Sequence, residues 1–222
     1  MIHKTTLQFL RALSQHNDRE WFHAHRSEYD AARQNVLETG YLLLEEINKF
    51  DPIGFYDLRK TMFRIARDTR FAADKSPYKT NFGLLFNREG TTRSPGYYLH
   101  IEPANCFLSC GLYMPLPEEL KALRTAIEND FERFKEIVGH HAFQQAFGDL
   151  CRDSDTLSRV PNGFDKQSPA AAYLKLKHFY VMASLSEKKL LADSFIREAA
   201  ERYRLMKPLN AFLNEAIRSP WH

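Results

Sequence analysis

The stretch YYLHIEPANCFLSCGLYM, residues 97–114, decides the fold. Tyr97, Leu99 and Ile101 alternate with more polar neighbours. Turn-forming residues follow at 103–105, and a second alternating segment runs over 106–114. Alternation with a period of two is typical of half-buried strands, and a short turn between two such segments indicates a hairpin. The stretch therefore predicts two neighbouring antiparallel strands that share one apolar face.

The flanking segments extend this hairpin into a larger sheet with helices on both sides. Asn81 to Phe86 predicts a third strand, joined to the hairpin by turn residues at 87–96. Before position 51 and after position 117 the apolar period changes to three or four residues, which is typical of helices. The remaining expected elements are a short helix before position 16, helices over 19–50, 117–131, 132–138, 141–147, 170–176 and 187–206 and from Pro208, a bend or break at Gly40, and short strands over 61–65 and 179–183.

The order of helices, strands and helices predicts an α+β protein, in which an antiparallel β-meander packs against helices from the N- and C-terminal thirds. The 222 residues, 44% of them hydrophobic and without a Ser-, Gly- or Pro-rich linker, favour a single domain over residues 1–222. The N-terminus shows no signal-peptide pattern, and no apolar run approaches the length of a membrane span. Cys106, Cys110 and Cys151 have no paired spacing, so we expect free thiols and a cytoplasmic protein.

Positive charge is concentrated in one segment ahead of the predicted sheet. Between Arg59 and Thr80 the chain has seven Lys or Arg residues and two Asp residues, a local net charge of +5, whereas the whole chain carries +3. Focused positive charge is typical of a surface that binds anions. The alternative is a structural network in which Asp68 and Asp74 pair with their neighbours. Two carboxylates cannot neutralise seven cations, which favours a ligand.

The end of this segment, residues 74–80, predicts a shaped loop that leads into the strand at Asn81. Pro77 fixes its own backbone and pushes Ser76 toward an extended conformation, so the segment cannot lie inside a helix. Phe71 and Tyr78 interleave aromatic rings with the cations. Arginine supplies a planar fork for phosphate or carboxylate, and lysine supplies a point charge. We therefore expect a basic and aromatic pocket here.

Tyr98 and His100 share the polar face of a predicted strand. If that face looks toward the basic loop, His100 is the natural proton-transfer group. The alternative is an exposed or hydrogen-bonded histidine without a chemical role. The full set of candidate ligand-binding residues is Arg64, Arg67, Arg70, Lys75, Tyr78, Lys79, Tyr98 and His100.

Motifs for metal, nucleotide or nucleophile chemistry give little support for an assigned reaction. Glu20-x-x-His23 has the spacing of half a di-iron site, but no second such motif lies on a predicted helix. The chain has no GxxxxGK[ST], GxGxxG or GxSxG pattern. We therefore expect no metal and no cofactor, and the sequence leaves open whether the protein is an enzyme.

Several segments carry a resemblance to a known family. They are RIARDTRFAADKSPYKT (64–80), DREWF (18–22), PGYYLHIEP (95–103), CGLYMP (110–115) and PNGF (161–164). On these segments the chain resembles, over nearly its whole length, a widespread family of uncharacterised proteins, mainly bacterial with fungal and plant members, catalogued as a domain of unknown function. The resemblance implies no activity, so the functional hypothesis rests on the residues themselves.

The leading hypothesis is that residues 64–80 bind an anionic ligand, with a phosphorylated small molecule as one candidate. The rival hypothesis is a protein-interaction or nucleic-acid-binding module in which the same residues form a structural ionic network. An open basic surface with exposed aromatic side chains would favour the rival. Nucleic acid is the less favoured partner, no membrane partner is expected, and the oligomeric state is left open.

Overall fold

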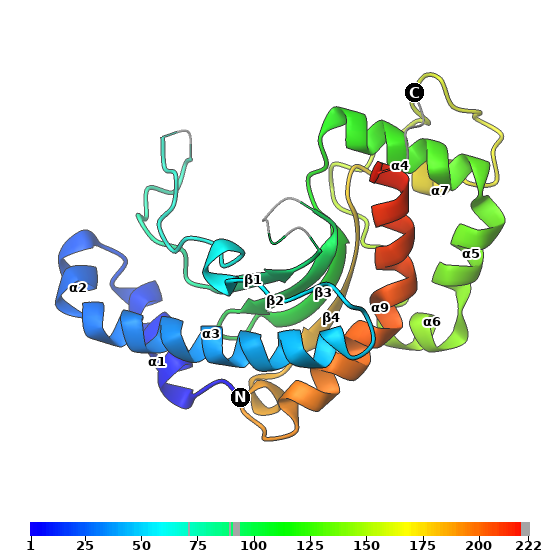
Figure 1. Cartoon of the computed structure of the whole chain (residues 1–222). Coiled ribbons are helices and arrows are strands. Elements are labelled where there is room, and N and C mark those ends of the chain that lie inside the picture. The colour runs from blue at the N-terminus through cyan, green and yellow to red at the C-terminus, as the bar shows by residue number, and fades with distance from the viewer. Residues whose placement is uncertain (71, 89, 91–93, 219–222) are drawn as a thin grey trace. The chain divides into compact units, whose positions relative to one another are not determined.

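The computed structural model describes residues 1–70, 72–88, 90 and 94–218, which form an α+β protein with a four-stranded antiparallel sheet (Figure 1). The elements before the sheet are α1 (Lys4–Gln15), α2 (Arg19–Ala24), α3 (Arg26–Asn48) and the short 3-10 helix η1 (Leu58–Lys60). Between the third and fourth strands lie α4 (Pro117–Asn129), α5 (Phe131–Gly139), α6 (His141–Phe147) and α7 (Ala171–Leu174). After the sheet come α8 (Glu187–Leu190) and α9 (Phe195–Arg218).

The sheet is a meander in which sequence order equals spatial order. Its strands are β1 (Phe82–Phe86), β2 (Gly96–Ile101), β3 (Cys106–Leu112) and β4 (Phe179–Leu185). The predicted α+β class and antiparallel meander are confirmed. Alternate residues form an apolar buried face, as Leu84, Leu99 and Leu108 show on successive strands. The predicted connection over 87–96 lies partly outside the described residues, as does Phe71.

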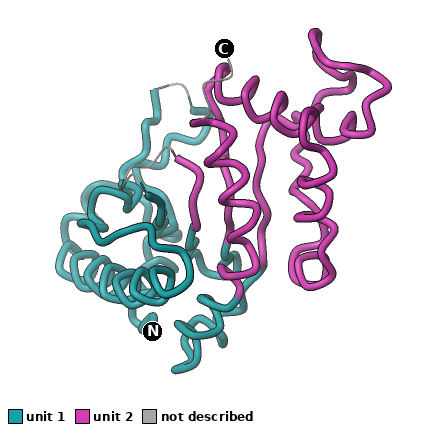
Figure 2. Tube along the Cα trace, turned by 45° about the vertical axis from the view of Figure 1, so that its right-hand side comes forward, with its two compact units in different colours: residues 1–92, 98–108, 184–201 teal, residues 93–97, 109–183, 202–222 magenta. Residues whose placement is uncertain are grey.

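The described chain gathers into two compact units (Figure 2). Unit 1 comprises residues 1–92, 98–108 and 184–201, and unit 2 comprises residues 93–97, 109–183 and 202–222. Each unit combines segments that are distant in the sequence. The single domain over residues 1–222 stays a prediction.

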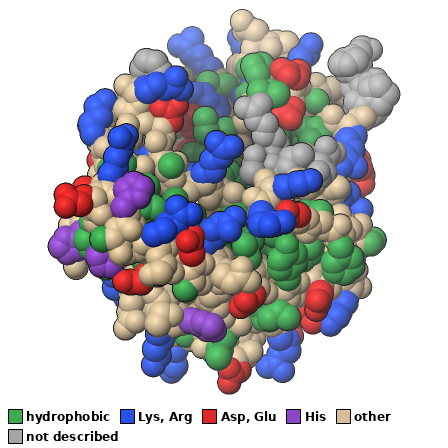
Figure 3. Space-filling model, turned by 60° about the vertical axis from the view of Figure 1, so that its left-hand side comes forward, with side chains coloured by type: hydrophobic (Ala, Val, Ile, Leu, Met, Phe, Trp, Pro, Cys, Tyr) green, Lys and Arg blue, Asp and Glu red, His purple; other side chains and the backbone are tan. Residues whose placement is uncertain are grey.

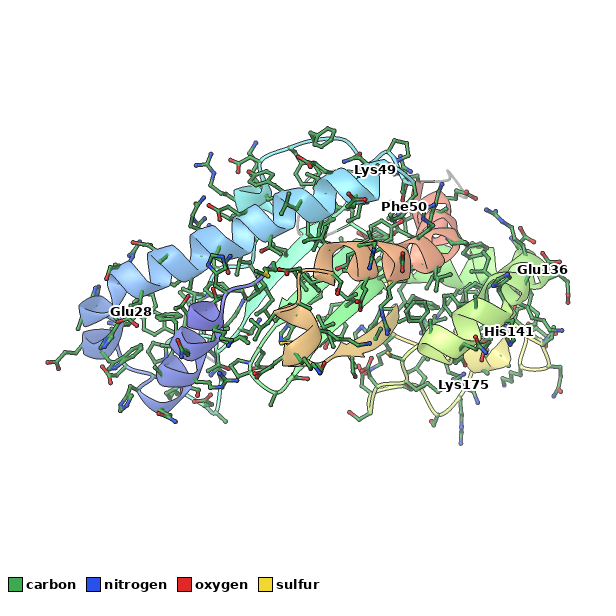
Figure 4. All side chains as sticks on the ribbon, turned by 90° about the horizontal axis from the view of Figure 1, so that it is seen from below. Glu28, Lys49, Phe50, Glu136, His141 and Lys175 are labelled. Carbon is green, nitrogen blue, oxygen red and sulfur yellow. The ribbon has the colours of Figure 1, made fainter. Side chains whose placement is uncertain are left out.

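The long helix predicted over 19–50 is interrupted at His25 rather than at Gly40. Asp18 caps α2 by accepting a hydrogen bond from the Trp21 N–H, and His25, with φ −105° and ψ 24°, ends that helix before α3 begins. Gly40 instead lies within α3, where a Cβ would come 2.8 Å from Cδ1 of Leu84 in β1. Glycine therefore lets α3 pack closely on the sheet. Figure 4 shows α3 from Glu28, near its start, to Lys49 and Phe50 beyond its end.

Two other expected elements differ from the structure. The single helix predicted over 187–206 is wrong, because α8 ends at Leu190 and α9 begins at Phe195. A hydrogen bond from Glu198 N to the Ser194 carbonyl starts this second helix. Pro208, expected to begin a helix, lies inside α9. The strand predicted over 61–65 is also wrong, since the region makes isolated bridges, such as Met62 with Leu84, after η1 ends.

No helix among the described residues is both long and apolar enough to span a membrane. Cys106, Cys110 and Cys151, all within the described residues, form no disulfide.

Candidate functional site

Residues 64–70 and 72–80, called the arm below, belong to unit 1 and form a narrow antiparallel loop that leads into β1 (Figure 1). At the base of the arm Lys79 N donates to the Ile65 carbonyl at 2.7 Å, and Arg67 N donates to the Pro77 carbonyl at 2.9 Å. These backbone bonds fix where the Arg67 and Lys79 side chains emerge. In the outer part of the arm, Ala72 N donates to the Thr69 carbonyl at 3.4 Å.

One side chain fastens the arm to the connection between α1 and α2. Asn17 Oδ1 accepts from Tyr78 N at 3.1 Å, and Asn17 Nδ2 donates to the Tyr78 carbonyl at 2.9 Å. The amide thus pairs with Tyr78 as a neighbouring strand would. The Tyr78 ring stacks on buried Phe22 with ring centroids 4.0 Å apart. Together, Asn17 and Phe22 position the inner edge of the arm.

Two arginines of the arm form ion pairs with its two aspartates. Arg70 contacts Asp68 at two points, and its Nη2 lies 2.7 Å from Oδ2. Arg67 pairs with Asp74 across the arm. Hydrogen bonds from Ser76, together with Arg67, hold the pKa of Asp74 well below its usual range. Ion pairing within residues 59–80, the structural alternative to a ligand site, therefore accounts for two of the seven cations of that segment.

Two further cations of the arm, one at its base and one farther out, face solvent. Arg64 is exposed. Lys75 is exposed as well, and its Nζ donates to the Thr69 carbonyl at 3.0 Å. Neither side chain lies on the cavity described next.

A polar cavity of about 360 Å³ opens beside the base of the arm. Its lining residues come from α1, from the α1–α2 connection and from the arm and the residue that follows it. Among them Arg67 and Lys79 are positively charged, and Asp74 is the one carboxylate. Figure 3 shows one face of the molecule on which Lys and Arg side chains gather, with Asp and Glu side chains between them. The charged lining thus carries one excess positive charge.

Lys79 is the less neutralised of the two cavity cations. Its Nζ lies 5.6 Å from the centroid of the Phe63 ring. Among the residues that the structure describes, no carboxylate pairs with this amine. Burial, with a contribution from the nearby Arg67 charge, lowers the pKa of Lys79. A bound anion would therefore find an amine whose charge no protein group in the described chain already balances.

A chain of hydrogen bonds leads from the cavity across β2. Thr80 Oγ1 donates to Glu102 Oε1 at 2.8 Å, and His100 Nε2 lies 3.3 Å from Glu102 Oε2. Because an ionised carboxylate only accepts, Nε2 carries the proton and Nδ1 accepts from the Tyr98 hydroxyl at 2.9 Å. Tyr98 lies over Gly83, where a Cβ would come 2.4 Å from its hydroxyl. This series of hydrogen bonds therefore positions Thr80, whereas Tyr98 and His100 do not line the cavity.

This chain predicts a pH dependence of stability. Burial lowers the pKa of His100 below its usual value of 6.5, and Glu102 opposes this shift only in part. The unfolded chain therefore takes up the proton first, so stability present above pH 6.5 is lost as the pH falls through the folded pKa. We expect the free energy of unfolding, measured in urea, to fall from about pH 7 to about pH 5, and to fall less in His100→Gln. Equal decreases in both proteins would contradict a buried neutral His100.

Within unit 2, the described residues Asp153, Asp155 and His178 place ligand-type atoms within 4.8 Å of one another. The backbone N–H of Met114 donates to His178 Nδ1 at 3.0 Å. Nε2 of the neutral ring must then carry the proton, and it lies 3.6 Å from Asp155 Oδ2. A metal needs the lone pair of that nitrogen. The cluster is therefore better explained as a histidine donating to a carboxylate.

Three of the eight predicted ligand-binding residues line the cavity, and these are Arg67, Tyr78 and Lys79. The other predicted residues lie elsewhere on the arm or on β2. The prediction missed Asn17, which holds the arm, and Thr80 and Asn81, which line the cavity beside Lys79. Thr80 ends the basic segment and Asn81 follows it, so proximity alone could have suggested them. Nothing in the sequence around Asn17 signals its contact with Tyr78.

The structure is that of an α+β protein in which a polar arm leads into the first strand of a four-stranded antiparallel sheet. The chain belongs to the family described as conserved hypothetical protein (DUF2461), whose model matches residues 5–212. Searches of curated proteins and of solved structures found no match to this chain. The family description names no activity, so function is inferred from the site.

Proposed function

We propose that the protein binds a small anion in the cavity beside the arm, with Arg67 and Lys79 as the cationic donors. The observation that carries this proposal is that both cations line one polar cavity in which Asp74 is the one carboxylate. Like charges repel, and a bound anion removes that repulsion. A phosphate or carboxylate group of a small metabolite matches both the charge and the size of the cavity.

Neutral donors beside the two cations support the same ligand class. The side chains of Asn17 and Thr80 are used within the protein, by Tyr78 and Glu102. Asn81 differs, because its side-chain amide has no hydrogen-bond partner among the described residues. Its N–H groups are therefore available to an anion oxygen. We also propose a cytoplasmic location, which is supported by three described cysteines that form no disulfide with one another.

The rival proposal is that the arm is a structural ionic network on a protein-interaction or nucleic-acid-binding surface. The pairs Arg67–Asp74 and Arg70–Asp68 favour it. Arg70, Asp68 and Asp74 are exposed and Arg67 is half-buried, and ion pairs open to solvent contribute little to stability. The network therefore does not explain why the half-buried Lys79 lacks a carboxylate partner in the described chain.

Inorganic phosphate and sulfate are expected to raise the melting temperature. At a concentration 100 times the dissociation constant, mass action adds about 2.7 kcal/mol, or roughly 5–10 °C for a chain of this size. Arg67→Ala should abolish the rise because it removes a cavity cation. Arg70→Ala is the matched control and should keep the rise, since Arg70 is off the cavity. Equal responses of the two variants would refute the assignment of the site.

A further inference from the structure

Lys79 differs in its surroundings from Lys75, the other lysine of the arm. It is half-buried and lines the cavity, whereas Lys75 is exposed and donates to the Thr69 carbonyl. No carboxylate in the described chain pairs with the Lys79 amine. Lys49, by contrast, pairs with Glu46 on the surface of α3. Unlike Lys75 and Lys49, Lys79 places its amine beside both a cavity and a second cation.

The surroundings of this amine disfavour its protonated form. Burial against protein removes water from the ammonium group, and the Arg67 guanidinium adds like-charge repulsion. Both effects lower the pKa of Lys79. The charged groups that share its cavity are Arg67 and Asp74, and Asp74 is engaged by Arg67. A desolvated lysine beside another cation is the arrangement that activates amine nucleophiles.

We propose that Lys79 forms an imine with the carbonyl group of a small anionic aldehyde or keto compound held in the cavity. The inference rests on the proposed anion binding, because Arg67 would hold the carboxylate or phosphate of that compound. Nζ of the neutral amine gives its electron pair to the carbonyl carbon, and a C–N bond forms as the C=O bond opens. The two amine hydrogens leave with the carbonyl oxygen as water, so no oxidant or reductant is needed.

Asn81 supplies a second group for this step. Both Lys79 and Asn81 line the cavity just before β1. The Asn81 amide is without a partner in the described chain, so it can donate a hydrogen bond to the carbonyl oxygen. That bond would polarise the carbonyl toward attack. Asn81 would then orient the substrate while Lys79 forms the covalent bond.

The test is reductive trapping on the unmodified full chain. The protein is treated with glyoxylate and sodium cyanoborohydride, and labelled lysines are quantified by peptide mass spectrometry. We expect Lys79 to be labelled more than about tenfold faster than Lys75, because a bound carbonyl reacts at a high effective concentration. Inorganic phosphate should slow labelling of Lys79 without affecting Lys75. Labelling of Lys79 at the rate of Lys75 would overturn the inference.

Two further experiments separate this inference from the proposed function. Propanal has a carbonyl but no anionic group, so it should label Lys79 less selectively than glyoxylate does. Selectivity with propanal but not with glyoxylate would overturn the inference, because the anion would then play no part. If phosphate raises the melting temperature and glyoxylate still fails to select Lys79, imine formation is wrong and anion binding stands. If both tests fail, both proposals are wrong.

Discussion

Gly111→Ala is expected to destabilise the protein by about 3 kcal/mol, through overpacking and backbone strain. Gly111 lies in β3 with φ +133°, a conformation that residues with a side chain rarely adopt. A Cβ there would come 2.1 Å from the Phe179 carbonyl oxygen and 2.7 Å from Cα of Tyr180. Both are backbone atoms of β4, so neither can rotate away. The midpoint of urea unfolding, followed by circular dichroism, measures the loss.

Gly139→Ala is the matched control for this prediction. Gly139 ends α5, and a Cβ there would meet nothing within 4 Å. Alanine favours the helical conformation over glycine by up to about 1 kcal/mol, so stability should be unchanged or slightly raised. Similar unfolding midpoints for the two variants would show that β3 and β4 do not approach each other as closely as described.

Asn17→Ala is expected to cost about 1–3 kcal/mol and to abolish the stabilisation by phosphate. The substitution leaves the half-buried Tyr78 N–H and carbonyl without their partners. The arm then loses its fastening to the α1–α2 connection, and Arg67 and Lys79 lose their fixed spacing. Urea unfolding measures the first effect, and melting curves with and without phosphate measure the second.

Asn48 provides a close control, because its side-chain amide makes the same pair of hydrogen bonds with the backbone of Gly54. Asn48 Nδ2 donates to the Gly54 carbonyl at 3.0 Å, and Gly54 N donates to Asn48 Oδ1 at 2.8 Å. Asn48→Ala should therefore lower stability while the phosphate response persists. A phosphate response that survives Asn17→Ala would mean that the arm does not need this fastening to form the site.

The sheet was predictable because its signal is local. Alternation within each strand and turn residues between strands determine which segments pair and which face is buried. The helix boundaries were less predictable. The apolar pattern continues across His25 without interruption, so it does not indicate the break there. Pro208 lies inside α9, although proline more often begins a helix.

The sequence indicated the segment that contains the candidate site, but not which of its side chains line one cavity. The density of cations and Pro77 marked the segment as a shaped basic loop. Which cations converge depends on side-chain rotamers and on contacts between distant residues. Asn17 and Tyr78 are 61 residues apart, and no local pattern indicates their pairing. Arg70 turns back to Asp68, two residues away, which no spacing rule for regular structure would require.

Isothermal titration calorimetry with inorganic phosphate tests the central claim most directly. The parent and Lys75→Met should each bind one phosphate per chain. Lys79→Met should bind at least about tenfold more weakly, since it loses a charge-assisted hydrogen bond from the cavity while keeping the length of the side chain. Absence of phosphate binding by the parent, or equal affinities of the two variants, would contradict anion binding by Lys79 beside the arm.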